Sequence, residues 1–166
     1  LQEGQAILAK AVEHHQAERF AQAKLEYERV LQLEPDNPDA LNLLALLFFQ
    51  EKNFEAAASF AQQAIAQRQH PLYYNSLGTA QKELGRLDEA MASYRKSIEL
   101  MDNYFDPHNN LATLYQARGD FVSAIKSYKK ALQLAPHSTG ALFNLGLTLK
   151  EYGEIAEAKA VFRKAS

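Results

Sequence analysis

Cysteine is absent from the sequence, so the chain can form neither a disulfide nor a thiolate metal site. Long apolar runs are also missing. The longest, residues 40–49, is interrupted by Asn42 and has about half the length that a transmembrane helix needs. The first residues lack the basic-then-apolar pattern of a secretion signal. We therefore expect no membrane insertion, while the compartment stays open, with the cytoplasm slightly favoured.

The sequence also lacks an excess of either charge. It has 18 lysines and arginines and 20 aspartates and glutamates, which gives a net charge of −2. No basic block is long enough to neutralise a phosphate backbone, which argues against a nucleic-acid partner. Motifs of the H-E-x-x-H type and glycine-rich phosphate loops are absent. The adjacent His14 and His15 would point about 100° apart on a helix, so they suit no single metal. We expect no cofactor, no metal and no catalytic residues.

What the sequence does contain is a repeat. An alanine recurs at intervals of 34, 33, 34 and 34 residues, at Ala23, Ala57, Ala90, Ala124 and Ala158. Numbering each repeat so that this alanine is position 20 gives the ranges 4–37, 38–70, 71–104, 105–138 and a truncated 139–166. The second repeat is one residue short, near the junction at His70. A period of this length indicates stacked units rather than one ordinary globular core.

Each repeat reads as two helices joined by a turn. In the fifth repeat, positions 4, 7, 8 and 11 hold Leu142, Leu145, Gly146 and Leu149, which is the spacing of one buried helical stripe; the first repeat departs from it, with Lys10 at position 7 and His14 at position 11. Positions 8 and 20 hold only glycine or alanine, as two closely packed helices require. Three turns carry a glycine suited to a left-handed helix end, at Gly85, Gly119 and Gly153. The first two turns have Glu18 and Lys52 instead, so we expect strain there.

The fourth repeat shows the full pattern, with His108, Leu111, Ala112 and Tyr115 in its first helix, then Gly119, Ala124, Tyr128 and Pro136. This spacing resembles the tetratricopeptide repeat (TPR). The resemblance implies an all-α, right-handed superhelix (α-solenoid) of antiparallel helix pairs, with about five repeats and ten helices in a single array, 1–166. It also implies that the first helices line a groove that binds peptides or partner helices without catalysis. His108 takes the usual tryptophan position, so we interpret it as a core histidine.

The groove can be located on a helical wheel, because positions 2, 5, 6, 9, 12 and 13 lie opposite the buried stripe. Asparagine recurs there, and its amide can both donate to and accept from a peptide backbone. This row resembles in part the asparagine ladder of TPR domains in O-linked N-acetylglucosamine transferases; the alternative is that Asn-Leu belongs to the TPR consensus itself. The candidate groove residues are Asn42, Leu46, Phe49, Leu72, Asn75, Thr79, Lys82, Asn109, Asn110, Thr113, Gln116, Phe143, Asn144 and Leu147.

The sequence leaves two possible roles open both for the apolar groove residues and for the paired basic residues. The apolar groove residues either contact a ligand or are buried by neighbouring repeats. Paired basic residues at positions 25 and 26, such as Lys129 and Lys130, form a solvated ridge or meet an acidic partner. A clamp for a peptide carboxylate, which in the family needs lysine at position 5 and asparagine at position 9, is not matched, although Lys82 could meet an acidic side chain.

The predicted function is a protein-interaction scaffold whose partner is a protein or peptide. One alternative is the substrate-recognition arm of a larger enzyme, such as an O-linked glycosyltransferase. Another is a structural protein that forms homo-oligomers through its C-terminal repeat. In the given sequence that repeat reaches Ser166 with no polar capping helix to pack on Val161 and Phe162. The start at Leu1 rather than methionine suggests a piece of a longer protein.

Overall fold

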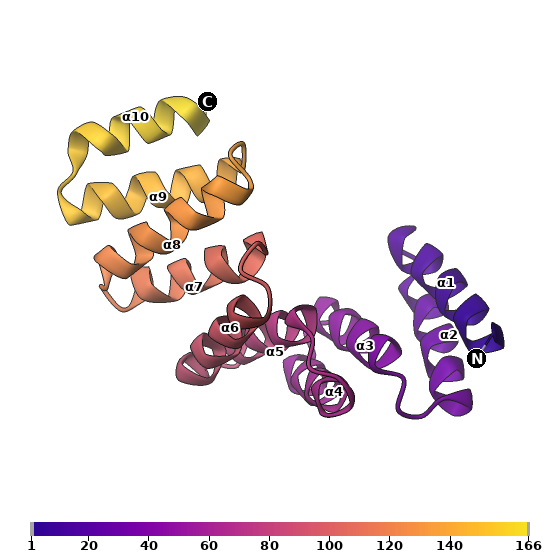
Figure 1. The fold of residues 1–166 in the computed structure, drawn as a ribbon. Helices are drawn as coiled ribbons and strands as arrows, with labels where there is room; N and C mark the ends of the chain where they lie inside the picture. Colours follow the sequence, from indigo (N-terminus) through magenta and orange to yellow (C-terminus); the bar gives the residue numbers. More distant parts are fainter. Residues whose placement is uncertain (1, 166) are drawn as a thin grey trace. The chain divides into compact units, whose positions relative to one another are not determined.

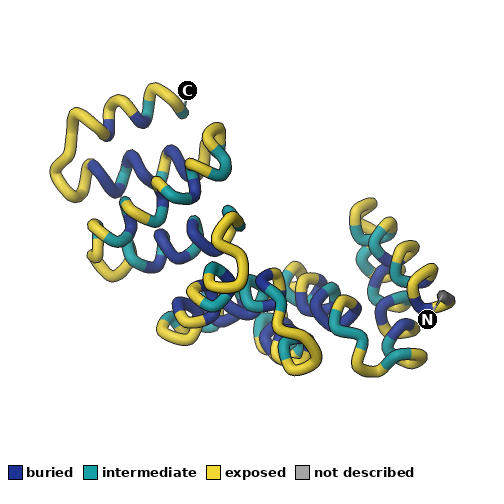
Figure 2. Tube along the Cα trace, in the orientation of Figure 1, coloured by how far each residue is buried: buried dark blue, intermediate teal, exposed yellow. Residues whose placement is uncertain are grey.

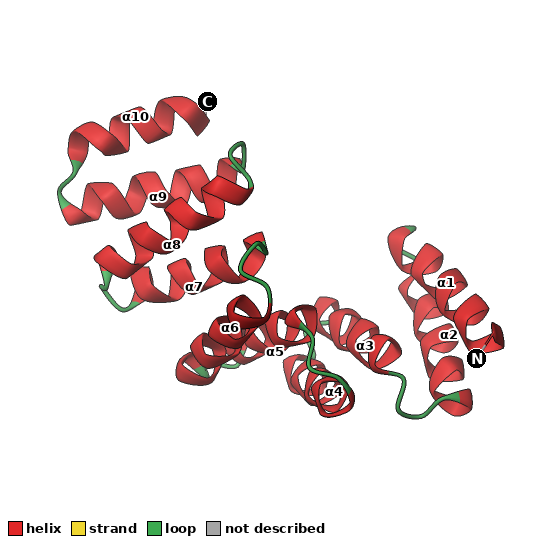
Figure 3. Ribbon diagram, in the orientation of Figure 1, coloured by secondary structure: helices red, strands yellow, loops and turns green. Residues whose placement is uncertain are grey.

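Ten helices joined by short loops make up residues 2–165, the part of the chain that the computed structural model describes (Figures 1 and 3). No strand occurs within this range, and Leu1 and Ser166 lie outside it. The all-α class is therefore confirmed, with one helix pair in each predicted repeat. The helices are α1 (Gln2–Gln16), α2 (Phe20–Leu33), α3 (Pro38–Gln50), α4 (Phe54–Gln67), α5 (Pro71–Glu83), α6 (Leu87–Leu100), α7 (Phe105–Ala117), α8 (Phe121–Leu134), α9 (Thr139–Tyr152) and α10 (Ile155–Ala165).

The chain forms two compact units, residues 1–90 and 91–166, and the boundary between them falls within α6. In the first unit, α1 packs on α2 and α3 on α4, while α2 and α4 each also contact the first helix of the following repeat. In the second unit, α7 packs on α8, α8 on α9, and α9 on α10. These helices are thus held mainly by their neighbours in sequence, as in a repeat protein.

Small residues bring the two helices of a repeat together, as the sequence predicts. Ala45 of α3 and Ala57 of α4 share one buried cluster, and Ala112 of α7 and Ala124 of α8 share another. In the fifth repeat a methyl group added to Gly146 would lie 2.5 Å from a ring carbon of Phe162. The buried segments follow these inner faces, and the loops are exposed (Figure 2).

Aromatic side chains fill the space beside the small residues. The side chains of Tyr27 and Tyr128, at position 24, are fully buried. The second repeat has Ala61 at that position, and the stack of Phe60 on Phe48, with ring centroids 5.2 Å apart, supplies the missing aromatic contact. The Phe60 ring therefore takes the place of the aromatic side chain that position 24 of this repeat lacks.

Most helices whose caps are resolved begin with a short polar side chain that accepts a backbone N–H of the first turn. Asn37 accepts from Ala40 at 3.0 Å, Asn53 caps α4, and Asp120 accepts from Ser123 at 3.1 Å. The hydroxyl and the backbone N–H of Ser123 both bond to the Asp120 carboxyl, and these two bonds lower the pKa of that carboxyl. Such caps fix where each helix starts and keep the repeats in register.

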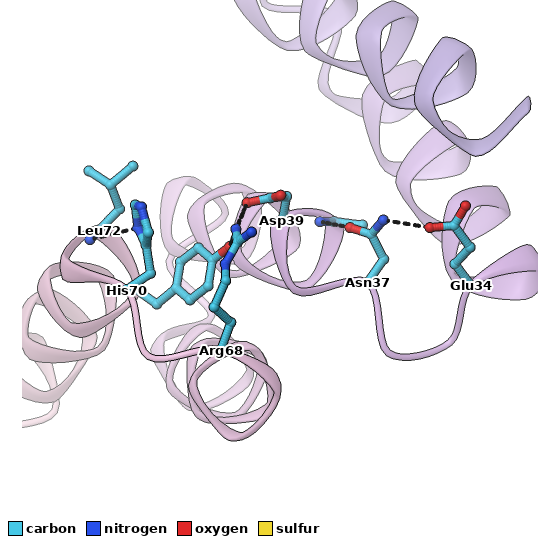
Figure 4. A network of polar contacts seen from close by, with 8 residues as sticks. Glu34, Asn37, Asp39, Arg68, His70 and Leu72 are labelled. Atoms are coloured by element: carbon cyan, nitrogen blue, oxygen red, sulfur yellow. Dashed lines mark hydrogen bonds and ion pairs between the residues drawn. The ribbon is translucent and has the colours of Figure 1, made fainter. Parts of the chain in front are cut away.

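The junction between the second and third repeats is one residue short because its loop has three residues, 68–70, where the other inter-repeat loops have four. Figure 4 shows Arg68 reaching from the end of α4 toward Asp39 of α3. The Arg68 guanidinium lies 2.5 Å from the Asp39 carboxylate, which also accepts a bond from the Tyr73 hydroxyl at 2.5 Å. Three helices are therefore tied together at this short loop.

The backbone of the two glycine-free turns is left-handed, with φ of 57° at Glu18 and 59° at Lys52. Side chains with a Cβ pay about 1–2 kcal/mol for this conformation, whereas Gly85, Gly119 and Gly153 adopt it freely. The strain expected from the sequence is therefore located at two single residues.

Replacing Lys52 by glycine should raise the free energy of unfolding by about 0.5–1 kcal/mol, because relief of the left-handed strain exceeds the extra entropy of glycine in the unfolded chain. Urea unfolding followed by circular dichroism measures the change. Lys52→Ala is the matched control, since alanine loses the same charge but keeps a Cβ. Equal stability of the two variants would contradict the assignment of strain.

Stability should also fall at alkaline pH. Burial raises the pKa of Tyr27 to about 12, and burial followed by the bond to Asp39 raises the pKa of Tyr73 to about 12. The unfolded chain releases these protons at about pH 10. The stabilising effect is therefore complete below about pH 10 and is lost as the pH rises toward 12.

Urea midpoints measured at about pH 9 and about pH 11 test this tyrosine effect. Tyr27→Phe should reduce the difference between the two midpoints, because phenylalanine cannot ionise. Tyr152→Phe, a change of an exposed tyrosine, should leave the difference unchanged. An unchanged difference in Tyr27→Phe would refute the role of burial.

Candidate functional site

The candidate groove residues of the first unit lie on α3 and α5, two first helices that contact each other. Leu46 and Leu72 are exposed, at 38% and 43%. Phe49 is half-buried, and its ring lies 5.3 Å from that of Phe54. Of the two readings of the apolar groove residues, exposure to a ligand thus fits Leu46 and Leu72, whereas Phe49 also contributes to the core.

Asn42 lies differently from what the helical wheel indicates. Its residue surface is only 6% exposed, and no described residue donates a hydrogen bond to its Oδ1. The wheel gives the direction of a side chain but does not show how far the neighbouring α5, which packs on α3, covers it. The result is a buried acceptor without a donor, which costs about 1–3 kcal/mol.

Polar residues on α5 supply the rest of this face. The Thr79 hydroxyl donates to the carbonyl of Asn75 at 2.8 Å, one turn earlier in the helix. Asn75 is half-buried, and Lys82 lies 3.2 Å from Glu83. At the start of the helix, the His70 Nδ1 accepts from the backbone N–H of Leu72 at 3.3 Å (Figure 4). This cap fixes the start of α5.

In the second unit the candidate residues lie on α7 and α9, which also contact each other. Phe143 is 51% exposed, with its ring 5.8 Å from Phe162, and Leu147 is half-buried. The Thr113 hydroxyl donates to the carbonyl of Asn110 at 2.7 Å. Asn144 is also half-buried. An exposed aromatic ring beside partly buried amides is a surface that can bind both apolar and polar groups.

Asn109 repeats the situation of Asn42 at the same position of its repeat. Its Oδ1 is buried, and no donor for it exists among residues 2–165, although the residue as a whole is half-buried. Most buried polar atoms in native proteins have a partner, so two orphaned acceptors at one repeat position are unusual. Both lie on first helices, α3 and α7.

Gln116 has a structural role in addition to its place on this face. Its Nε2 donates to Glu151 of α9 at 3.3 Å, and its Oε1 accepts from the Tyr128 hydroxyl at 3.2 Å. Burial raises the pKa of Tyr128 well above its usual range. Both ends of this amide are therefore engaged within the unit, so Gln116 links α7, α8 and α9.

The histidines of the described chain form no metal centre. No group of three histidine, aspartate or glutamate side chains able to hold a metal occurs within residues 2–165. His15 contacts the Tyr27 hydroxyl at 3.1 Å, whereas His108 is buried and directs its Nε2 to the carbonyl of Asp102 at 2.8 Å. The core position inferred for His108 is therefore found.

One surface feature is not anticipated by the sequence. A hollow of 380 Å³ lies between α7 and α8, and a second of 440 Å³ follows α8. None of the fourteen candidate groove residues lines either hollow. The available signal was the run Lys126, Lys129 and Lys130, because a lysine at position 22 occurs in no other repeat.

Comparisons with known proteins give the family. Tetratricopeptide repeat models match residues 8–71, 105–138 and 139–166, and a TPR repeat model matches residues 78–119. Together they span nearly the whole chain. The chain belongs to the tetratricopeptide repeat family. No helix of this TPR chain within residues 2–165 has the length and apolar character that crossing a membrane would demand.

Solved structures agree on the fold. PilF of Pseudomonas aeruginosa is 19% identical, with a TM-score of 0.90 over 99% of this chain and 77% of that one. The protein MamA is 22% identical, with a TM-score of 0.81 over 98% of this chain and 89% of the other. YrrB, described as a TPR protein with an unusual peptide-binding site, is 16% identical, with a TM-score of 0.75 over 96% and 82%. At these identities the likeness establishes the TPR fold.

Changing Asn42 to leucine should leave the TPR chain as stable or raise its free energy of unfolding by about 1 kcal/mol, because leucine has the same branching and needs no donor. Thermal and urea unfolding measure the change. Leu44→Asn, which places an amide at a fully buried position of the same helix, is the opposite control and should destabilise by several kcal/mol. A clear loss of stability in Asn42→Leu would mean that Oδ1 has a partner.

Proposed function

We propose that this TPR chain is a non-catalytic scaffold that binds an extended segment of another protein along its first helices. The observation that carries the proposal is the pair of orphaned acceptors at one repeat position, Oδ1 of Asn42 and of Asn109. An extended peptide presents backbone N–H groups at regular intervals. A rotation about the soft terminal torsion of an asparagine can turn its amide toward such a donor.

Apolar contacts would supply affinity beside these hydrogen bonds. Leu72 in the first unit is exposed on α5, which also carries Asn75, and Phe143 in the second unit is exposed on α9, which also carries Asn144. Burying an exposed side chain of this size contributes about 1.5–3 kcal/mol. Each unit therefore offers an apolar anchor next to polar groups that read a backbone, which is the combination found in peptide sites.

The family supports a scaffold rather than an enzyme. Every group on the candidate face is an amide, a hydroxyl, an apolar side chain or a lysine, and no pair of a nucleophile and a base is present among the described residues of this face. The neighbour YrrB is described as having a peptide-binding site, which favours the same kind of ligand here.

Asn75→Ala combined with Asn109→Ala should weaken binding of a peptide selected from a displayed library by about 30-fold, since two hydrogen bonds of about 1 kcal/mol each are lost. Fluorescence anisotropy with the labelled peptide gives both affinities. Helicity should be unchanged, because both side chains are partly exposed and alanine favours helix.

Asn103→Ala is the matched control for this experiment, because Asn103 is exposed in the loop before α7 and lies off the first-helix face. Its affinity should equal that of the unchanged chain. Equal affinity of the double variant and the control would show that the asparagine row does not bind the peptide. Failure of any library peptide to bind would count against the groove as a whole.

A further inference from the structure

The hollow between α7 and α8 is built from both helices of the fourth repeat and the loop before it. Its lining on α7 and the loop is Asp102, His108, Leu111 and Tyr115. Its lining on α8 is Ser123, Lys126, Ser127 and Lys130. The floor is partly apolar and aromatic, and the rim carries hydroxyl and ammonium groups. With a volume of 380 Å³ the hollow has room for one or two side chains of a partner.

Positive charge exceeds negative charge around this hollow. Lys130 lies 2.5 Å from the Asp102 carboxylate, and this bond lowers the pKa of Asp102. Lys126 has no ion pair within the part of the chain that the structure describes. Arg95 of α6 adds a further cation, because it donates to the Tyr115 hydroxyl at 3.0 Å and lies over its ring at 5.8 Å. Asp102 neutralises one of these three cations.

An amphipathic strip continues the hollow along α8. The second hollow, of 440 Å³, shares Lys126 and Lys130 with the first and adds Val122, Ile125 and Lys129. Val122 is 61% exposed, so its apolar surface is accessible to a partner. Lys129 is paired with Glu157 at 2.8 Å, so Lys126 is the cation of the strip that is left for a partner.

The second unit as a whole is also positively charged. Residues 91–166 contain 10 lysines and arginines and 7 aspartates and glutamates, a net charge of +3. Residues 1–90 contain 8 and 13, a net charge of −5. An acidic partner is therefore attracted to the second unit and repelled by the first, which steers it toward α8.

We propose that this surface is a second binding site, which takes an acidic peptide segment of another protein in which a glutamate or aspartate stands next to an apolar residue. The carboxylate enters the hollow between α7 and α8 and accepts from Lys126 and Ser127. The neighbouring apolar side chain covers Val122 and Ile125. A nucleic acid fits less well, because the strip offers few free cations and Asp102 would face a phosphate. The site lies off the asparagine row and does not depend on it.

The test uses a short fluorescein-labelled peptide in which glutamates alternate with leucine and phenylalanine, titrated with the whole chain and followed by anisotropy. Lys126→Glu should weaken binding by about tenfold, because it replaces an attraction by a repulsion at the carboxylate. It breaks no described ion pair, so the helicity should be retained. A peptide with glutamine in place of glutamate should bind about tenfold more weakly to the unchanged chain.

Lys159→Glu is the matched control, since it makes the same change of charge at an exposed position of α10 that lines neither hollow. Its affinity should stay within about twofold of the unchanged chain. Equal losses in Lys126→Glu and Lys159→Glu would overturn the proposal in favour of unspecific attraction. Asn109→Ala should leave this peptide's affinity unchanged, which separates the site from the proposed groove.

Light scattering over a range of concentrations completes the test. A monomer that binds the acidic peptide supports the proposal. A concentration-dependent oligomer that Lys126→Glu dissolves would overturn it, because the occupant of the strip would then be the acidic part of a second copy.

Discussion

The close approach of the two helices within each repeat is the contact on which the rest of this protein depends. It is made where alanines from both helices meet, as Ala11 and Ala23 do in the first repeat and Ala45 and Ala57 in the second. A larger side chain at these points would separate the helices and open the tyrosine-filled core beside them. Because this face of each first helix is committed to its partner, the opposite face can carry exposed apolar groups such as Leu46, Leu72 and Phe143.

The repeat spacing predicts much of this architecture because it reports local constraints. Small residues, turn glycines and capping side chains each act within one helix pair, so the pattern predicts ten helices, the short junction at residues 68–70 and the strain at Glu18 and Lys52. Such features need no knowledge of distant contacts.

Features of the surface are less predictable, because they depend on how far one helix covers another. A helical wheel gives the direction of Asn42 but not its burial, which is decided by the packing around α3. The hollow beside α8 is likewise invisible in the repeat pattern, since it combines a loop residue, Asp102, with side chains from two helices. The sequence distinguishes Lys126 only as a lysine at position 22, and the ion pairs of Lys129 and Lys130 show that it is the one of the three without a carboxylate partner among the described residues.

The two candidate faces use different physics and would respond differently to their surroundings. Amides that pair with a peptide backbone carry no net charge, so salt has little influence on them. Lysines on an exposed helix act through charges that are screened over about 8 Å at physiological ionic strength. A partner held on the first helices would therefore stay bound as salt rises, whereas one held on α8 would be released. The two proposed sites would thus differ in the salt dependence of their affinities.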